Sequence, residues 1–430
     1  MNHSPRVREW GPMNSPRHET LNSPRHAYRP PVAPKNRRYS AFVYWRRRVL
    51  VALLVTTVVV VGYLGITLGF ALVNPSYGVS MQARFAEWGR QHGLGPEVTW
   101  IETEYYKLHP AKVGGAPPLT AFGSGTTAVR VAVGGHLPPP RTIPTPAVKP
   151  LPGEGVWHVA GRETATGIPT MYEAFVRPDA VHTSYVVGVA WMDPTLLQAQ
   201  LYSGSTIPGG GPYPYTAPIT AKSSENLVAA FNAGFRMSDA NGGYYTDGRT
   251  IVPLRKGAAS VVVFKDGTMT VAKWGTDVTM SSQVASVRQN LDLIVQNSKP
   301  VAGLTNANVM KWGKTLGGGF NVWRSGLGVT KDGALVYVGG PSLSISDLAN
   351  VLVRAGAVRG MELDINTDWV QFSAFKGPLN TPINGGNGVS LESAMAGTPS
   401  RYFATWWTRD FYTMSLRPKA TTTTSTTASG

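Results

Sequence analysis

The feature that most limits the fold is an apolar stretch of 25 residues, 49–73, that contains no charged side chain. A helix rises about 1.5 Å per residue, so this stretch would extend roughly 37 Å, enough to cross a bilayer core with some tilt. Three arginines, 46–48, directly precede it, whereas the charges after it roughly cancel. The positive-inside rule then places the N-terminus in the cytoplasm and everything after residue 74 outside. A cleaved signal peptide would have a shorter apolar region, so we expect a single-pass signal anchor at the cell membrane.

The residues before this stretch, 1–48, are strongly basic and lack hydrophobic periodicity. They hold eleven Lys or Arg against two acids, a local charge of +9 out of a net +16 for the whole chain. Such a composition cannot bury enough apolar surface to offset chain entropy, so we expect a disordered cytoplasmic leader. Because much of the charge lies in this leader, we do not interpret it as a nucleic-acid-binding surface. The threonine-rich tail, 419–430, is also expected to be disordered.

Residues 74–152 are expected to connect the membrane anchor to a folded domain. Residues 77–93 predict a short amphipathic helix that packs on the main domain. The chain then becomes rich in proline and glycine, and 137–152 predicts an extended linker that is partly polyproline II. The folded domain is therefore expected to begin at residue 153.

From residue 153 to 418 the sequence predicts an α+β fold, a β-rich mixed-sheet domain with few helices. Two turns of the Lys-Asp-Gly type, at 265–267 and 331–333, separate β-branched runs and predict hairpins. The clearest predicted helices are 223–230 and 344–356. The second has a capping box formed by Ser344 and Asp347, and a glycine that can end it.

The candidate site lies on the strand that follows the second of these helices. Side chains alternate along an extended chain, so one face of this strand is expected to be apolar and the other to carry Glu362, Asp364 and Asn366. Burying an acid on an otherwise apolar strand costs free energy, and this cost favours a functional role for Asp364.

Several kinds of chemistry are excluded. The chain has no cysteine, so disulfides, zinc–thiolate sites and thiol nucleophiles are absent. Its eight histidines all precede residue 183, no Gly-x-Ser-x-Gly elbow is present, and no phosphate-binding Walker loop occurs. Carboxylates, amides and arginines remain as the groups available to a site around Asp364.

Four segments taken in order carry a resemblance to a known family. They are Phe231-Asn-Ala-Gly-Phe235, the hairpin 264–268, the segment 324–333 and the strand containing Met361-Glu-Leu-Asp364. Together they resemble the phosphodiester glycosidase family, over about residues 225–406. The resemblance implies a hydrolase acting on sugar-1-phosphodiesters, with cell-envelope glycans as the expected source. Family members usually continue the acidic strand as Asp-Gly-Gly-Gly-Ser, where this chain has Asp364-Ile-Asn-Thr-Asp368.

Within such a site each candidate residue has an expected task. Asp364 and Glu362 would supply acid, base or nucleophile, and their Cα atoms, about 6.6 Å apart on a strand, fit either a retaining or an inverting pair. A phosphate leaving group needs its charge neutralised, which suits the guanidinium fork of Arg324. The remaining candidates are Asn232 for a sugar hydroxyl or a water, and Arg236, Asn366, Asp247 and Arg255 for substrate binding.

Plainer explanations exist for some of these residues. Glu362 could pair with a neighbour such as Arg359, Asp247 could serve as a turn former, and Arg255 could be a solvated surface charge.

No cofactor is expected to be required. Asp364, Asn366 and Asp368 nevertheless have the spacing of positions 1, 3 and 5 of a calcium-binding loop. A divalent cation site of looser geometry therefore remains an alternative. The alternative to an enzyme is an envelope glycan-binding protein that kept the fold and lost the chemistry, because of the departure at 364–368.

Overall fold

The computed structural model describes residues 40–123, 127, 135–304, 312–313 and 321–418. The chain divides into two compact units, Met1–Tyr63 and Leu64–Gly430. The predicted leader falls mostly outside the described residues, and the threonine-rich tail lies wholly outside them.

The first unit contains most of a long apolar helix, α1, which runs from Ala41 to Val73. It is long and apolar enough to cross a membrane. The helix begins about two turns before the uncharged stretch, with residues 41–48, which include Arg46, Arg47 and Arg48. Its last ten residues, 64–73, belong to the second unit.

Two helices follow α1 where the sequence predicted one. They are α2 (Met81–Gln91) and α3 (Gly95–Leu108), preceded by the short 3₁₀ turn η1 (Pro75–Tyr77) and followed by η2 (Leu119–Phe122). Ser80 caps α2 by accepting a hydrogen bond from the amide of Ala83. The expected linker is partly packed on the domain, since Ile143 is buried and its amide bonds the carbonyl of Gly155.

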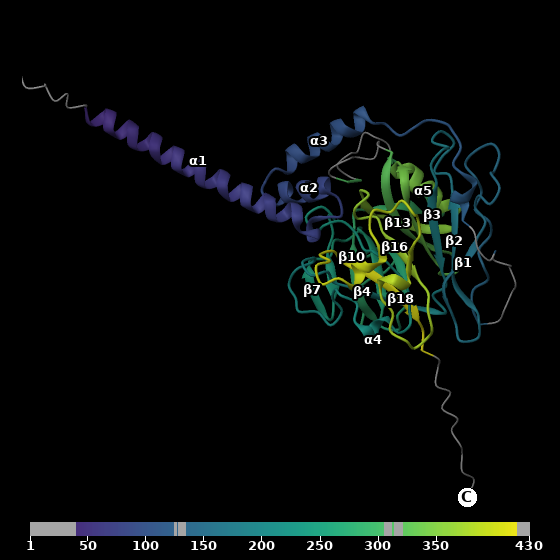
Figure 1. Cartoon of the computed structure of the whole chain (residues 1–430). Coiled ribbons are helices and arrows are strands. Elements are labelled where there is room, and N and C mark those ends of the chain that lie inside the picture. The colour runs from purple at the N-terminus through teal and green to yellow at the C-terminus, as the bar shows by residue number, and fades with distance from the viewer. Residues whose placement is uncertain (1–39, 124–126, 128–134, 305–311, 314–320, 419–430) are drawn as a thin grey trace, which may run out of the picture. The chain divides into compact units, whose positions relative to one another are not determined.

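Within the described residues the strands form three antiparallel sheets (Figure 1). The largest has the order β1-β2-β3-β14-β13-β15-β11-β12. These strands are His158–Glu163, Pro169–Val176, Val187–Met192, Leu335–Leu343, Val322–Thr330, Ala357–Ile365, Leu293–Gln296 and Lys299–Pro300. The predicted hairpin at 331–333 joins β13 to β14, next to the acidic strand β15.

The two smaller sheets each have five strands among the described residues. One has the order β7-β6-β10-β8-β9, formed by Arg249–Val252, Tyr244–Thr246, Val284–Gln289, Ala259–Phe264 and Met269–Lys273. The other has the order β17-β16-β5-β18-β4, formed by Gly388–Ser390, Phe372–Phe375, Leu227–Asn232, Phe411–Leu416 and Leu197–Tyr202. The short 3₁₀ turns η4 (Gly385–Asn387) and η5 (Pro399–Phe403) flank β17.

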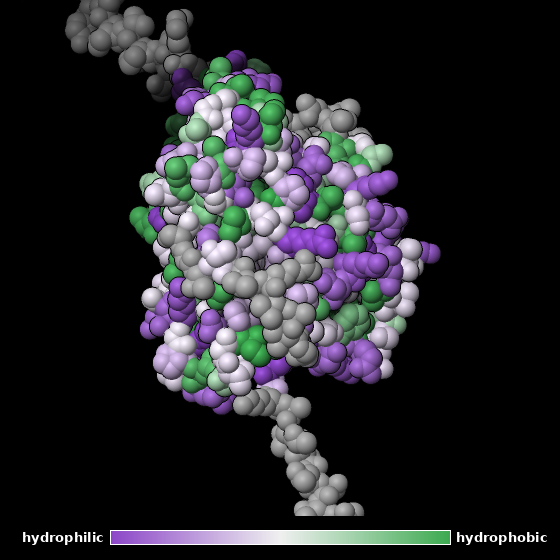
Figure 2. Space-filling model, turned by 90° about the vertical axis from the view of Figure 1, so that its right-hand side faces the viewer, coloured by the Kyte–Doolittle hydropathy of each residue, from purple (hydrophilic) through white to green (hydrophobic). Residues whose placement is uncertain are grey.

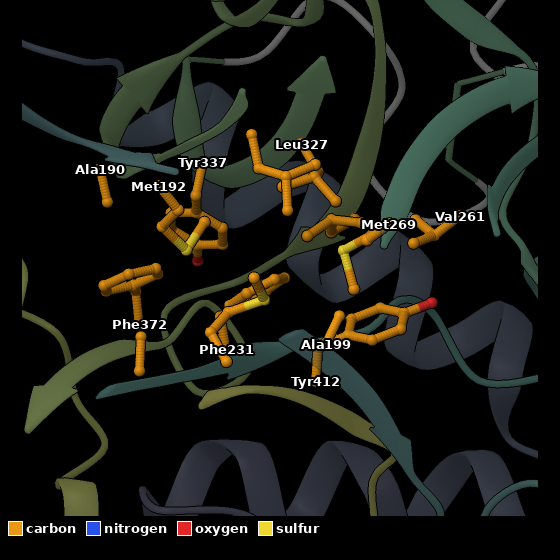
Figure 3. Close-up of a cluster of buried hydrophobic side chains, with 14 of the residues drawn as sticks. Ala190, Met192, Ala199, Phe231, Val261, Met269, Leu327, Tyr337, Phe372 and Tyr412 are labelled. Atoms are coloured by element: carbon orange, nitrogen blue, oxygen red, sulfur yellow. The ribbon is translucent and has the colours of Figure 1, made fainter. Parts of the chain in front are cut away.

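The main hydrophobic core contains side chains from all three sheets. Figure 3 shows its centre, where Phe231 of β5, Tyr337 of β14, Phe372 of β16 and Tyr412 of β18 gather with aliphatic side chains. The ring centroids of Phe231 and Phe372 are 5.7 Å apart in a stacked arrangement. Figure 2 shows hydrophilic and hydrophobic residues interspersed over one outer face of the molecule.

The predicted helix 344–356 is confirmed as α5 (Ile345–Arg354), with the capping box between Ser344 and Asp347 in place. It packs on the large sheet through a second core. The predicted helix 223–230 is wrong. Only the short α4 (Ala221–Ser224) is helical there, and Leu227–Asn232 forms β5, a strand buried on both faces. A short, continuous apolar run is ambiguous between a helix and a buried strand, and tertiary packing decides.

Candidate active site

A β-bulge in β15 places the two acids of that strand on opposite faces of the sheet. On the neighbouring strand β13, Ser325 pairs with Asp364 and Gly326 pairs with Glu362, with the register shifting between them. Paired residues share a face and consecutive residues alternate, so the extra residue Leu363 reverses the expected relation. The prediction that Glu362 and Asp364 line one face is therefore wrong.

Glu362 and Arg324 form a buried ion pair under α5. Arg324 Nη1 lies 2.6 Å from Glu362 Oε1, both side chains are fully buried, and Arg324 Nε donates to the carbonyl of Leu343 at 2.8 Å. Burial raises the pKa of Glu362 to about 7, against the opposing effect of Arg324. Neither residue lines the cavity that contains Asp364. The expectation that Arg324 shares a cleft with Asp364 is not met, because Arg324 turns to the face that Glu362 occupies.

Asp364 lies in a cavity of about 60 Å³ that is lined on one side by side chains of α2 and α3. The cavity is lined by Glu87, Arg90, Glu102, Phe235, Arg236, Asp239, Gly313, Asp364, Ile365, Asn366, Trp369 and Arg409. Asp364 is only 4% exposed, and its Oδ1 accepts a hydrogen bond from the amide of Ile365 at 2.8 Å. Burial raises the pKa of Asp364 to about 7, with Arg409 acting in the opposite direction.

Three arginines, Arg90, Arg236 and Arg409, share this cavity with Asp364, and Arg90 is paired with Glu102. Arg236 donates to Asp239 at 2.9 Å and to Glu87 Oε1 at 3.3 Å. Arg409 stacks on the ring of Trp369, 4.2 Å from the centroid, and its Nη2 lies 3.9 Å from Glu87 Oε2. Among the described residues, Arg409 Nη1 is buried with no hydrogen-bond partner. The carboxylate of Glu87 on α2 therefore lies within reach of both Arg236 and Arg409.

Arg409 was not among the predicted site residues. It precedes β18, whose first residue, Phe411, pairs with Asn232 at the end of β5. The adjacent Asp410 forms a buried ion pair with Arg288 of β10 at 2.6 Å. The available signal was an Arg-Asp pair one residue after two tryptophans and directly before a strand, but nothing in the sequence placed it beside Asp364.

Asn232 is buried within the protein's own hydrogen-bond network. Its Nδ2 donates to Ser325 Oγ at 3.0 Å, and its Oδ1 accepts from the hydroxyl of Tyr337 at 2.9 Å and from the amide of Gln371 at 3.2 Å. It ties β5 to β13, β14 and the start of β16 and does not line the cavity. This position favours a structural role over the predicted contact with a sugar.

Arg255 and Asp247 lie away from the cavity lining. Arg255 pairs with Asp292 at 2.7 Å, and each side chain of this pair is about one third exposed. Asp247 has a φ of 52° in the turn between β6 and β7, which fits the turn-forming explanation.

The loop after β15 contributes to the cavity and also anchors α2. Asn366 lines the cavity, with a φ of 99°. Asp368 Oδ1 accepts hydrogen bonds from the amides of Val79 and Ser80, both at 2.9 Å, and its Oδ2 accepts from Ser80 Oγ at 3.2 Å. Within the described ranges no group of three acidic or histidine side chains is placed to hold a metal ion. The divalent site at Asp364, Asn366 and Asp368 stays a prediction.

The fold and the cavity define a sheet-rich domain in which the buried carboxyl group of Asp364 shares a pocket with three arginines and three further carboxylates, and the guanidinium groups are the ones able to bind an anion. Residues 225–385 match the model of the phosphodiester glycosidase family. The resemblance inferred from the four sequence segments is thereby confirmed over this part of the chain.

Solved structures show weaker similarity. The catalytic domain of zebrafish N-acetylglucosamine-1-phosphodiester α-N-acetylglucosaminidase, auto-inhibited by a pro-peptide, is 15% identical with a TM-score of 0.39, covering 60% of this chain and 87% of that one. A hypothetical protein from Synechocystis is 12% identical with a TM-score of 0.30, covering 58% and 62% respectively. No curated protein matches the chain.

Proposed function

We propose that the protein is a membrane-anchored glycosidase that cleaves the glycosyl bond of sugar-1-phosphodiesters on the outer side of the cell membrane. The observation that carries this proposal is the meeting of Asp364, Arg236 and Arg409 in one cavity. The match to the phosphodiester glycosidase family supports the reaction class. The three arginines before the apolar stretch support the outward orientation.

Arg236 and Arg409 are the groups proposed to bind the phosphate. Glu87 already bridges them with one carboxylate oxygen directed at each, which is the contact pattern that a phosphate oxygen pair would reproduce. The cavity volume of about 60 Å³ is small for a sugar phosphate. A sugar phosphate would therefore have to displace Glu87 and part of α2 before it could bind.

Asp364 is proposed to act as a general base on the attacking water, without Glu362 as its partner. Since Glu362 lies on the other face of the sheet, the two-acid geometry of most glycosidases does not apply. A phosphate leaving group is a weak base and needs charge neutralisation more than protonation. Asp364 would take a proton from water as the water attacks C1, and the C1–O bond would break with its electron pair going to the phosphomonoester. A carboxyl pKa near 7 suits a base at neutral pH.

The test is hydrolysis of the methyl phosphodiester of N-acetylglucosamine-1-phosphate by the full chain in detergent. We expect Asp364→Asn to lower kcat by about 10²–10⁴-fold. Asp332→Asn, in the exposed turn between β13 and β14, is the matched control and should retain full activity. Equal rates for Asp364→Asn and the unmodified protein would remove Asp364 from the mechanism. Saturable binding of phosphodiesters by the unmodified protein without turnover would favour the glycan-binding alternative.

A further inference from the structure

The wall of the cavity is built from helices that are fixed to the end of α1. Trp88 of α2 donates its indole Nε1–H to Thr67 Oγ1 at 3.1 Å, and Arg84 Nη1 donates to the carbonyl of Leu72 at 2.8 Å. Both acceptors lie in the last ten residues of α1, within the same compact unit as the domain. Figure 1 shows α2 and α3 beside this end of α1.

The same helix, α2, faces the cavity on its other side. Glu87 lies next to Trp88 in the sequence, yet it contacts Arg236, whereas Trp88 contacts Thr67. Only the width of α2, about 10 Å, therefore separates the last turns of α1 from the cavity. If α1 crosses the bilayer, its final turns lie at the outer interface, and Arg236 and Arg409 lie close to the depth of the lipid headgroups.

The outward surfaces of α2 and α3 carry large apolar side chains that the described residues leave exposed. They include Met81 and Phe85 on α2 and Trp100, Ile101 and Leu108 on α3, with exposed fractions between 41% and 75%. Helices with exposed aromatic and aliphatic side chains next to a membrane helix are suited to the boundary between headgroups and acyl chains. The continuity with α1 makes the bilayer the occupant of this surface.

Resting on the proposed function, we infer that the substrate is a membrane-borne sugar-1-phosphodiester whose second ester is to a lipid alcohol. The bilayer would hold the lipid chain beside α2 and α3, and the phosphate would lie level with the two guanidinium groups. Water adds to C1 and the C1–O bond breaks. The free sugar leaves, and a lipid phosphate monoester stays in the bilayer.

The first experiment compares two phosphodiesters of N-acetylglucosamine-1-phosphate, one with a farnesyl and one with a methyl aglycone, using the full chain in phosphatidylcholine–phosphatidylglycerol vesicles. We expect kcat/KM to be at least about tenfold higher for the farnesyl compound, because it concentrates in the bilayer. Phe85→Ser with Trp100→Ser should reduce that advantage and leave methyl turnover unchanged. Val389→Ser, at an exposed valine of β17, is the matched control.

Each outcome discriminates between the two proposals. Equal rates on both compounds would overturn the lipid inference and leave the proposed function standing. A farnesyl preference that survives Phe85→Ser with Trp100→Ser would overturn the role of α2 and α3. Absence of turnover on both compounds would count against the proposed function.

A second measurement is independent of catalysis. The chain has no cysteine, so Phe85→Cys, Trp100→Cys and the control Val389→Cys can each be labelled at one position. We expect bilayer-bound quenchers to quench a fluorophore at Phe85 or Trp100 and to leave one at Val389 unaffected. Equal quenching at all three positions would refute the membrane contact of α2 and α3.

Discussion

The reassignment of Arg324 from phosphate binding to structure makes a quantitative prediction. Replacing Arg324 by methionine leaves Glu362 fully buried without the guanidinium 2.6 Å away. The carboxyl must then stay protonated in the folded state. Each pH unit above about 7, the folded-state pKa of Glu362 beside Arg324, then costs about 1.4 kcal/mol relative to the unmodified protein.

The expected loss of unfolding free energy for Arg324→Met is about 3–5 kcal/mol above pH 7, the range for breaking a buried ion pair. Because the pKa of Glu362 without Arg324 lies above about 7, the loss is largest at high pH and shrinks as pH falls below 7. The double variant Arg324→Met, Glu362→Leu removes both charges and should regain most of the stability.

Urea denaturation of the three proteins at pH 9 and pH 6 measures these differences, and the KM for the methyl phosphodiester measures substrate binding. We expect the KM of Arg324→Met to be unchanged below its unfolding transition. A stable Arg324→Met protein with a strongly raised KM would show that Arg324 binds the phosphate, and the reasoning from the β-bulge would be wrong.

Three further predictions concern the cavity. Burial raises the pKa of Asp364, so Asp364→Asn should increase the unfolding free energy at pH 8 by up to about 4 kcal/mol. In urea titrations this gain should fade as the pH falls toward 4. If the variant gains no stability at pH 8, the inferred cost of burying Asp364 is wrong. Arg409→Gln should weaken the binding of inorganic phosphate, measured by calorimetry, about 10–100-fold, whereas the exposed control Arg249→Gln should not change it. Equal phosphate affinities of Arg409→Gln and the unmodified protein would exclude Arg409 from the anion site. Glu87→Gln should tighten phosphate binding in the same assay, since an amide competes less well for Arg236 and Arg409; weaker binding would show that Glu87 helps to hold the ligand.

Local patterns predicted the elements whose signals lie within a few residues. The capping box of Ser344 and Asp347 and the hairpin turns at 265–267 and 331–333 were all confirmed. These features depend on hydrogen bonds and backbone angles of near neighbours. The sequence therefore carries their cause directly.

Features that depend on distant partners could not be predicted. The extra residue Leu363 is an ordinary leucine, and only the pairing with β13 shows it to be a bulge that separates Glu362 from Asp364. Residues 227–230 were predicted to be helical because the burial of β5 between layers is a property of the whole fold. Arg409 lies beside the cavity because β18, which follows it, pairs with β5, and this pairing is a property of the sheet topology.

The hydrogen bonds of Asp368 limit how the protein can be shortened for study in solution. A soluble fragment that starts at β1 lacks Val79 and Ser80, so the Asp368 carboxylate loses its donors from these residues. It also lacks Tyr106, which packs against Phe235 and Ile365 beside the cavity. Kinetic constants measured on such a fragment would describe an altered site, and a fragment that preserves the site must begin no later than Asn74.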